Sequence, residues 1–240
     1  MKLRWIGVLC VWSIVCWNAS AFAVTLTNSV SAFSGNQGQN GWFYGFIDQT
    51  AGRSFEQFDT FLPGANRWAA STAQIGSNNN EFLTLNSMGG HPTGLGPDAQ
   101  DAVILAVRRY VSPVNGNVDI AFDLRKQNIL NPNGGGITGR ILVDGTEVFS
   151  QFIANMDGVG VQQTITQSLL LGSTVDFVID PTGIANGPNS ELSARADGTI
   201  FSGILSTDTI PPNAVPEPST LLLFGTGLVG MIGWRLRHSF

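Results

Sequence analysis

The segment from Asn117 to Leu124, NVDIAFDL, has a large apolar residue at every second position. These four side chains share one face of an extended chain, while Asp119 and Asp123 share the other. A period of two residues is typical of a β-strand with one buried face. This segment therefore predicts a half-buried strand, and similar short segments recur along the chain.

Turn residues separate these segments. Gly, Asn, Ser and Thr recur at intervals of roughly eight to twelve residues, which favours a sandwich or barrel. The connector 112–116 predicts an antiparallel hairpin between 102–111 and the strand described above. Asp144-Gly145 predicts a second hairpin, closed by a two-residue type I′ turn.

We therefore expect residues 24–210 to form one all-β domain, an antiparallel, jelly-roll-like β-sandwich of about nine or ten strands without an amphipathic helix. The remaining strands are expected at Val161–Leu171, Thr174–Ile179, Thr199–Leu205, Thr25–Val30, Trp42–Ile47 and Glu81–Leu85.

Residues 1–23 have the layout of a secretory signal peptide. Lys2 and Arg4 precede an apolar stretch, and Ala21-Phe22-Ala23 is a small-residue cleavage pattern. Both cysteines of the chain lie inside this segment, so the mature protein contains none and has no disulfide. Export is the prediction that follows.

Charge excludes one class of partner. Between Val24 and Ala214 the sequence has 8 Lys and Arg against 16 Asp and Glu, a net charge of −8. Nucleic-acid binding depends on basic side chains that displace counterions from phosphates. We expect no nucleic-acid partner.

The domain offers little for catalysis. His91 is its only histidine, and the mature chain has no cysteine, so triad and His-rich metal mechanisms lack their residues. Asp119 and Asp123 could serve a glycoside hydrolase as a carboxylate pair, but solvation on a polar strand face explains them. We expect no enzyme, and interpret His91 as a loop residue bonded to backbone, with ligand contact as the alternative.

Aromatic residues give the main alternative to a purely structural role. In GWFYGFID, Trp42, Tyr44 and Phe46 lie on one strand face. Such a stripe either packs in the core, which is the commoner case, or stacks on sugar rings. Trp42, Tyr44 and His91 are accordingly the candidate ligand-binding residues of a carbohydrate-binding module.

Two further features are interpreted as structural. Arg108 and Arg109 are adjacent and must point to opposite strand faces, where a salt bridge is favoured over anion binding. Loop residues 179–191 carry oxygen ligands of the kind that Ca²⁺ prefers, Asp180, Asn186, Asn189 and Glu191. Because the spacing of a defined calcium motif is missing, we expect a solvated loop and no cofactor, with Ca²⁺ as the alternative.

The C-terminus has three parts: a Pro-rich linker, 211–218; an apolar segment, 219–234; and a basic tail, 235–240. At 1.5 Å per residue the apolar helix would reach about 24 Å, less than the roughly 30 Å of a hydrocarbon core. The following arginines predict that this end stays cytoplasmic, with the domain outside. The anchoring residues are expected to be Leu221, Leu222, Leu223, Phe224, Trp234, Arg235 and Arg237.

Pro216-Glu217-Pro218, the apolar Gly-rich run and the terminal arginines together resemble the PEP-CTERM sorting signal of Gram-negative bacteria. The resemblance implies a membrane-embedded exosortase as partner, a cysteine protease that cuts near the Pro-Glu-Pro motif. It also implies a surface or extracellular-matrix protein, held first in the inner membrane with its domain facing the periplasm. Residues 91–181 are similar to jelly-roll domains of carbohydrate-binding type, which implies extracellular polysaccharide as a further partner but identifies no binding residue.

Overall fold

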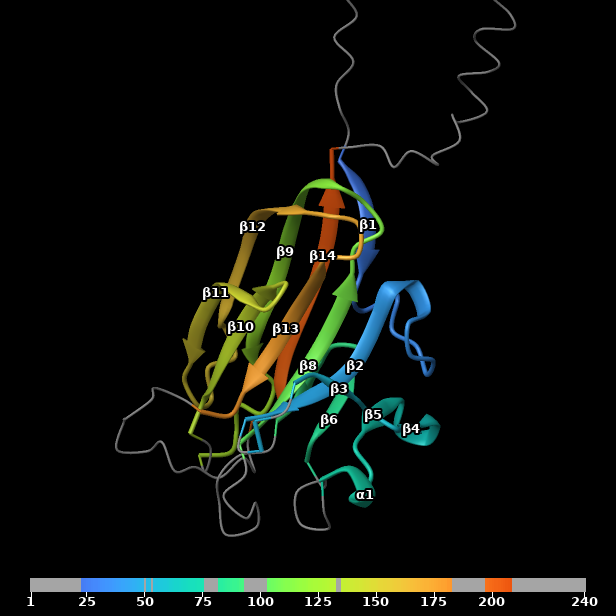
Figure 1. Ribbon diagram of the computed structural model, residues 1–240. Coiled ribbons are helices and arrows are strands. Elements are labelled where there is room, and N and C mark those ends of the chain that lie inside the picture. Colours follow the sequence, from blue (N-terminus) through green and yellow to red (C-terminus); the bar gives the residue numbers. More distant parts are fainter. Residues whose placement is uncertain are drawn as a thin grey trace, which may run out of the picture.

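The computed structural model describes residues 23–49, 51–52, 54–75, 82–92, 103–132, 135–182 and 197–208. Within these ranges the chain forms two antiparallel sheets that pack face to face (Figure 1). Helix is confined to the single turn α1 (Thr72–Ile75) and two 3-10 turns. The predicted all-β antiparallel sandwich is confirmed.

The large sheet has eight strands. Seven of them follow one another across the sheet, and the eighth, β1 (Val24–Asn28), pairs with β14. The order of the seven is β12 (Val161–Leu169), β9 (Gly116–Lys126), β14 (Thr199–Thr207), β7 (Gly89–His91), β6 (Thr84–Asn86), β5 (Arg67–Ala69) and β4 (Thr60–Leu62).

The small sheet has six strands. Their order is β11 (Thr146–Ile153), β10 (Ile137–Val143), β13 (Thr174–Asp180), β8 (Ile104–Val111), β2 (Trp42–Asp48) and β3 (Glu56–Gln57).

The core lies between the two sheets and is built by alternation along each strand. On β9, the side chains of Val118, Ile120 and Leu124 are fully buried, as the sequence predicts. Glycine allows the sheets to approach closely, because a Cβ atom on Gly203 of β14 would lie 2.5 Å from the Phe177 ring of β13. The two sheets thus bury one continuous apolar layer.

One predicted hairpin is confirmed. Strands β10 and β11 are joined by Asp144 (φ 49°) and Gly145 (φ 81°), and Val143 pairs with Thr146. Positive φ at both central residues is what a type I′ turn requires.

The other predicted hairpin is wrong. Strand β8 belongs to the small sheet and β9 to the large sheet, so their connector crosses between the sheets. The Ser112 N–H donates to the Ser173 carbonyl at 2.8 Å, and the Gly172 N–H donates to the Ser112 carbonyl at 2.8 Å. These bonds hold the connector from β8 to β9 beside the connector from β12 to β13, and both connectors cross from one sheet to the other. Turn residues predict that the chain reverses, but they do not specify which strand it will pair with.

The strand count is also larger than predicted, with fourteen strands in the described ranges. The strands that the sequence did not reveal are β3, β4, β5 and β7, which are two or three residues long. Segments this short cannot show a period of two. The expected strand at Glu81–Leu85 corresponds in part to β6.

Both ends of the domain lie at the same end of the sandwich. Val24 of β1 pairs with Thr207 of β14 (Figure 1). Almost all of the predicted signal peptide and the whole of the predicted sorting segment lie outside the described residues. Among the described residues, no helix has the length and apolar character needed to cross a bilayer.

Candidate functional site

The predicted aromatic stripe lies in the core. Trp42, Tyr44 and Phe46 project from β2 between the sheets and are each 0% exposed. The Trp42 indole N–H donates to Thr27 Oγ1 at 2.7 Å, and Tyr44 stacks on Trp68 with ring centroids 6.0 Å apart. All three are therefore core residues, and neither Trp42 nor Tyr44 presents a ring face to a ligand in this structure.

The two adjacent arginines have different environments. Arg109 lies on the outer face of the small sheet and binds Asp176 through two bonds, Nε to Oδ1 and Nη2 to Oδ2, both 2.7 Å long. The predicted salt bridge is confirmed there. Arg108 points into the core, donates from Nη2 to the Asn86 carbonyl, and leaves Nε and Nη1 without a partner among the described residues. Burial lowers the pKa of Arg108 to about 10.

A buried polar cluster lies where β7, β9 and β14 meet. Lys126 Nζ is 2.7 Å from Asp197 Oδ1, and the two side chains are 0% and 1% exposed. Burial lowers the pKa of Lys126 and raises that of Asp197, so each moves toward its neutral form. His91, the last residue of β7, lies close enough for the Lys126 charge to affect its pKa.

His91 makes the backbone hydrogen bond that the sequence predicts, but the expectation of a loop residue is wrong, because His91 is the last residue of strand β7. Its Nδ1 is 2.7 Å from the Pro92 carbonyl, so this nitrogen carries the proton, while Nε2 is buried and has no hydrogen-bond partner in the described part of the chain. Burial lowers the pKa of His91 to about 4; the bond to Pro92 opposes this shift and the Lys126 charge adds to it. The imidazole is therefore neutral at neutral pH.

Acidification should destabilise the domain through His91. Its pKa is about 4 in the folded chain against an ordinary value of 6.5, so between these pH values the unfolded state takes up a proton and the folded state does not. The contribution of the neutral His91 to the free energy of unfolding is fully present above pH 6.5. About 2 to 3 kcal/mol of this contribution is lost as the pH drops to 4. The raised pKa of Asp197 acts in the opposite direction.

Wild type and the His91→Gln variant should therefore be compared by urea denaturation at each pH, since Asp197 affects both. The free energy of unfolding of the variant should fall less between pH 6.5 and 4 than that of wild type, because the variant has no imidazole to protonate. An equal pH dependence for the two proteins would contradict the burial of a neutral imidazole.

The two candidate catalytic carboxylates are far apart. Asp119 and Asp123 lie on the outer face of β9, four positions apart, which corresponds to about 13 Å along a strand. Carboxylates that act on one glycosidic bond are roughly 5 to 9.5 Å apart. Asp119 instead accepts a hydrogen bond from Thr166 Oγ1 at 2.5 Å, and Asp123 pairs with Arg125 at 3.1 Å.

Part of the predicted calcium loop lies outside the described residues, including Asn186, Asn189 and Glu191. Asp180 is described, and its carboxylate accepts bonds from Arg140 and from the backbone and hydroxyl of Thr182. Among the described residues no group of three His, Cys, Asp or Glu side chains could hold a metal ion.

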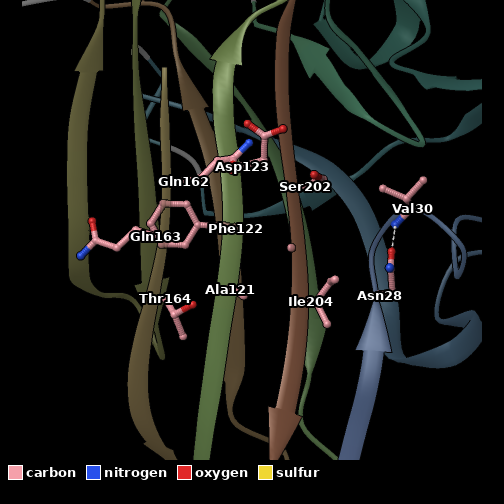
Figure 2. A pocket seen from close by; sticks show the side chains of 11 residues that line it. Asn28, Val30, Ala121, Phe122, Asp123, Gln162, Gln163, Thr164, Ser202 and Ile204 are labelled. Carbon is pink, nitrogen blue, oxygen red and sulfur yellow. Dashed lines mark hydrogen bonds between the residues drawn. The ribbon is translucent and has the colours of Figure 1, made fainter. Parts of the chain in front are cut away.

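An open groove crosses the outer face of the large sheet (Figure 2). Strands β12, β9 and β14 form its floor, and the end of β1 together with Val30, two residues beyond it, forms one side. Its volume is about 620 Å³, within the roughly 300 to 1,000 Å³ of small-molecule sites. It is the candidate site in the described part of the chain.

Strand pairing brings the groove residues into two rows. Gln162, Asp123 and Ser202 face one another across β12, β9 and β14. In the next row, Thr164, Ala121, Ile204 and Asn28 follow one another across the same strands and β1. Because side chains alternate, all of these point away from the core. The segments come from four distant parts of the chain.

The lining suits hydrogen bonding to hydroxyl groups. Amides, hydroxyls and one carboxylate supply donors and acceptors, while Ala121 and the 43% exposed Ile204 give a small apolar surface. Phe122, the one aromatic residue that borders the groove, points into the core and is 5% exposed. The groove therefore offers polar contacts without an aromatic stacking platform.

The groove carries little net charge. Among the described residues that line it, Asp123 alone is charged, and Arg125 Nε lies 3.1 Å from its Oδ2. The other oxygen, Oδ1, is shielded from solvent and has no hydrogen-bond partner within the described ranges. Such a site favours a neutral ligand with donor groups.

No curated protein matches the chain. Solved structures similar to it include a family 35 carbohydrate-binding module from Clostridium thermocellum, with 16% identity over 45% of this chain and 72% of that one and a TM-score of 0.27. CBM51 from Clostridium perfringens GH95 in complex with methyl-galactose has 16% identity over 50% and 81%, with a TM-score of 0.29. A β-glucosidase from Kluyveromyces marxianus in complex with glucose has 8% identity over 73% and 16%, with a TM-score of 0.26. Because the sequence identities and TM-scores are this low, no ligand and no binding residue of these proteins is assigned to this chain.

The tail gives a specific match. Residues 214–237 match the model of the PEP-CTERM protein-sorting motif, where the sequence predicted it. This segment begins seven residues after the last strand, β14, which ends at Thr207. The chain thus carries a PEP-CTERM motif, which implies a secreted, membrane-associated protein that an exosortase processes for the cell surface.

Proposed function

We propose that this chain is an exported surface or matrix protein with a non-catalytic β-sandwich, anchored in the inner membrane by residues 219–234 and cut near Pro216-Glu217-Pro218. The match at residues 214–237 carries the proposal. The fold supports it, because the last strand ends at the same end of the sandwich as the first strand begins. Anchoring there leaves the rest of the sandwich free to project from the membrane into the periplasm.

Replacing Pro216, Glu217 and Pro218 with Ala should block the cut, since the exosortase would lose the motif that it reads. In the native host the variant should remain in the membrane fraction at the mass of the uncut chain. Pro211→Ala with Pro212→Ala is the matched control, because it changes the same linker outside the motif, and it should be released as wild type. Release of the triple variant at wild-type mass would contradict the proposal.

A second function is favoured by the groove. We propose that it binds a neutral extracellular polysaccharide, because its polar lining, near-neutral charge and open shape suit a chain of sugar hydroxyls. The absence of a stacking ring among the lining residues implies modest affinity for a single chain. The separation of Asp119 and Asp123 supports binding without cleavage.

Affinity electrophoresis of residues 24–208 tests this function, since the whole described core lies within them. A soluble neutral glucan in the gel should retard wild type, and Gln162→Ala with Ser202→Ala should weaken the retardation at least about tenfold, through two lost hydrogen bonds. Ser168→Ala, on the same strand face beyond the groove, should behave as wild type. Equal retardation of all three proteins, or retention only by a polyanionic gel, would contradict a neutral-glycan groove.

A further inference from the structure

Strand β12 forms one outer edge of the large sheet (Figure 1). It pairs with β9 over all nine of its residues, from Val161 opposite Leu124 to Leu169 opposite Gly116, without a register shift. Among the described residues no strand pairs with its other side. In an antiparallel strand alternate residues direct their N–H and C=O groups to each side, so half of these groups face outward.

The other edges of the sandwich are blunted. At the edge of the small sheet, β11 carries a bulge at Val148 and the charged Glu147, and β1 carries a bulge at Leu26. The remaining edge strands, β3 and β4, have two and three residues. Bulges, charges and shortness are the usual means by which sheets avoid pairing with other chains.

Strand β12 has none of these features. Its sequence, VQQTITQSL, contains no charged residue, no Pro and no Gly. Gln162, Gln163, Thr164, Thr166 and Ser168 are exposed. Uncharged Gln, Thr and Ser side chains on a regular strand can hydrogen-bond to one another across an antiparallel strand pair. The edge is thus open and also self-complementary.

We propose that β12 is a self-association edge, along which a second copy of this chain adds its own β12 in antiparallel orientation to continue the large sheet. A two-fold axis through the strand pair lets each copy present the same surface. Charge supports a second copy as the occupant. Residues 24–214 carry a net charge of −8, so two copies repel over most of their surfaces, and this neutral strip is where they meet with least repulsion.

The association should be weak in dilute solution. One pair of nine-residue strands buries less than the roughly 1,200 Å² of a stable standard interface. It becomes effective where copies are concentrated, as on a cell surface or in a matrix. Because Gln162 and Thr164 also line the groove, pairing would place two grooves on one face of a continuous sheet, which would favour binding of a long polysaccharide.

Sedimentation velocity of residues 24–208 over a concentration series tests the proposal. Wild type should shift from monomer toward dimer as the concentration rises toward about 1 mM, the range of a weak interface. Thr166→Lys with Ser168→Lys should raise the dimer dissociation constant at least about tenfold, because like charges then line both strands. An equimolar mixture with Thr166→Glu, Ser168→Glu should restore association between the two variants.

Asn117→Lys with Ser206→Lys is the matched control, since it adds the same charge to the same face on β9 and β14, away from the edge. It should dimerise as wild type. A wild type that stays monomeric throughout, or a Lys edge variant that dimerises as well as wild type, would overturn the proposal. Both outcomes are independent of exosortase processing and of glucan retention.

Discussion

Replacing Lys126 with Met should lower the free energy of unfolding by about 3 to 5 kcal/mol, as expected when one partner of a buried ion pair is removed. The ammonium and the Asp197 carboxylate are 2.7 Å apart and almost wholly buried. Asp197 Oδ2 has no hydrogen-bond partner among the residues that the structure describes, so loss of Lys126 would remove the charge that compensates this carboxylate. Urea denaturation at pH 7 measures the loss.

Two further measurements separate this mechanism from simple loss of packing. The unpaired carboxyl can take up a proton, so the loss relative to wild type should shrink when the pH falls from 7 to 5. The double variant Lys126→Met, Asp197→Leu should recover most of the stability, because it removes both charges at once. A double variant as unstable as the single one would show that the charge pair is not the cause.

Trp42→Ala should be similarly costly, at about 3 to 5 kcal/mol, because it opens a cavity in the core. The indole is 0% exposed and lies against Tyr110 and Phe177, with ring centroids 5.1 and 5.9 Å away. Trp42→Phe keeps most of the volume but loses the bond to Thr27, and should cost about 1 to 3 kcal/mol.

The same variants decide between the two roles considered for Trp42. If the ring is a core residue, Trp42→Phe should lose stability yet bind glucan as wild type does. A variant that keeps full stability but loses glucan retention would make Trp42 a ligand platform and contradict its burial.

The sequence predicts individual strands well and their partners poorly. The alternation in β9 and the Asp144-Gly145 turn depend on neighbouring residues, so both are predictable. Whether β8 and β9 pair with each other or join different sheets depends on which surfaces meet in the core. The connector carries the same turn residues in both arrangements, so it does not distinguish them.

The candidate groove could not be predicted for the same reason. Asn28, Asp123, Gln162 and Ser202 come from four strands, and each resembles an ordinary solvated position. One local signal was present, since Ala121 is a small apolar residue between two aspartates on the polar face of β9. Lys126 and Asp197 are 71 positions apart in the sequence, and no local sequence pattern indicates that they form a pair. The sorting motif, by contrast, lies in one contiguous segment, so the sequence alone predicts it.

The intact mass of the extracellular protein from the native host tests the central claim most directly, because it reports both processing events at once. Export followed by exosortase cleavage predicts a chain that begins near Val24 and ends near Pro216-Glu217-Pro218, without the apolar segment and the terminal arginines. An extracellular protein whose mass includes residues 219–240 would contradict it.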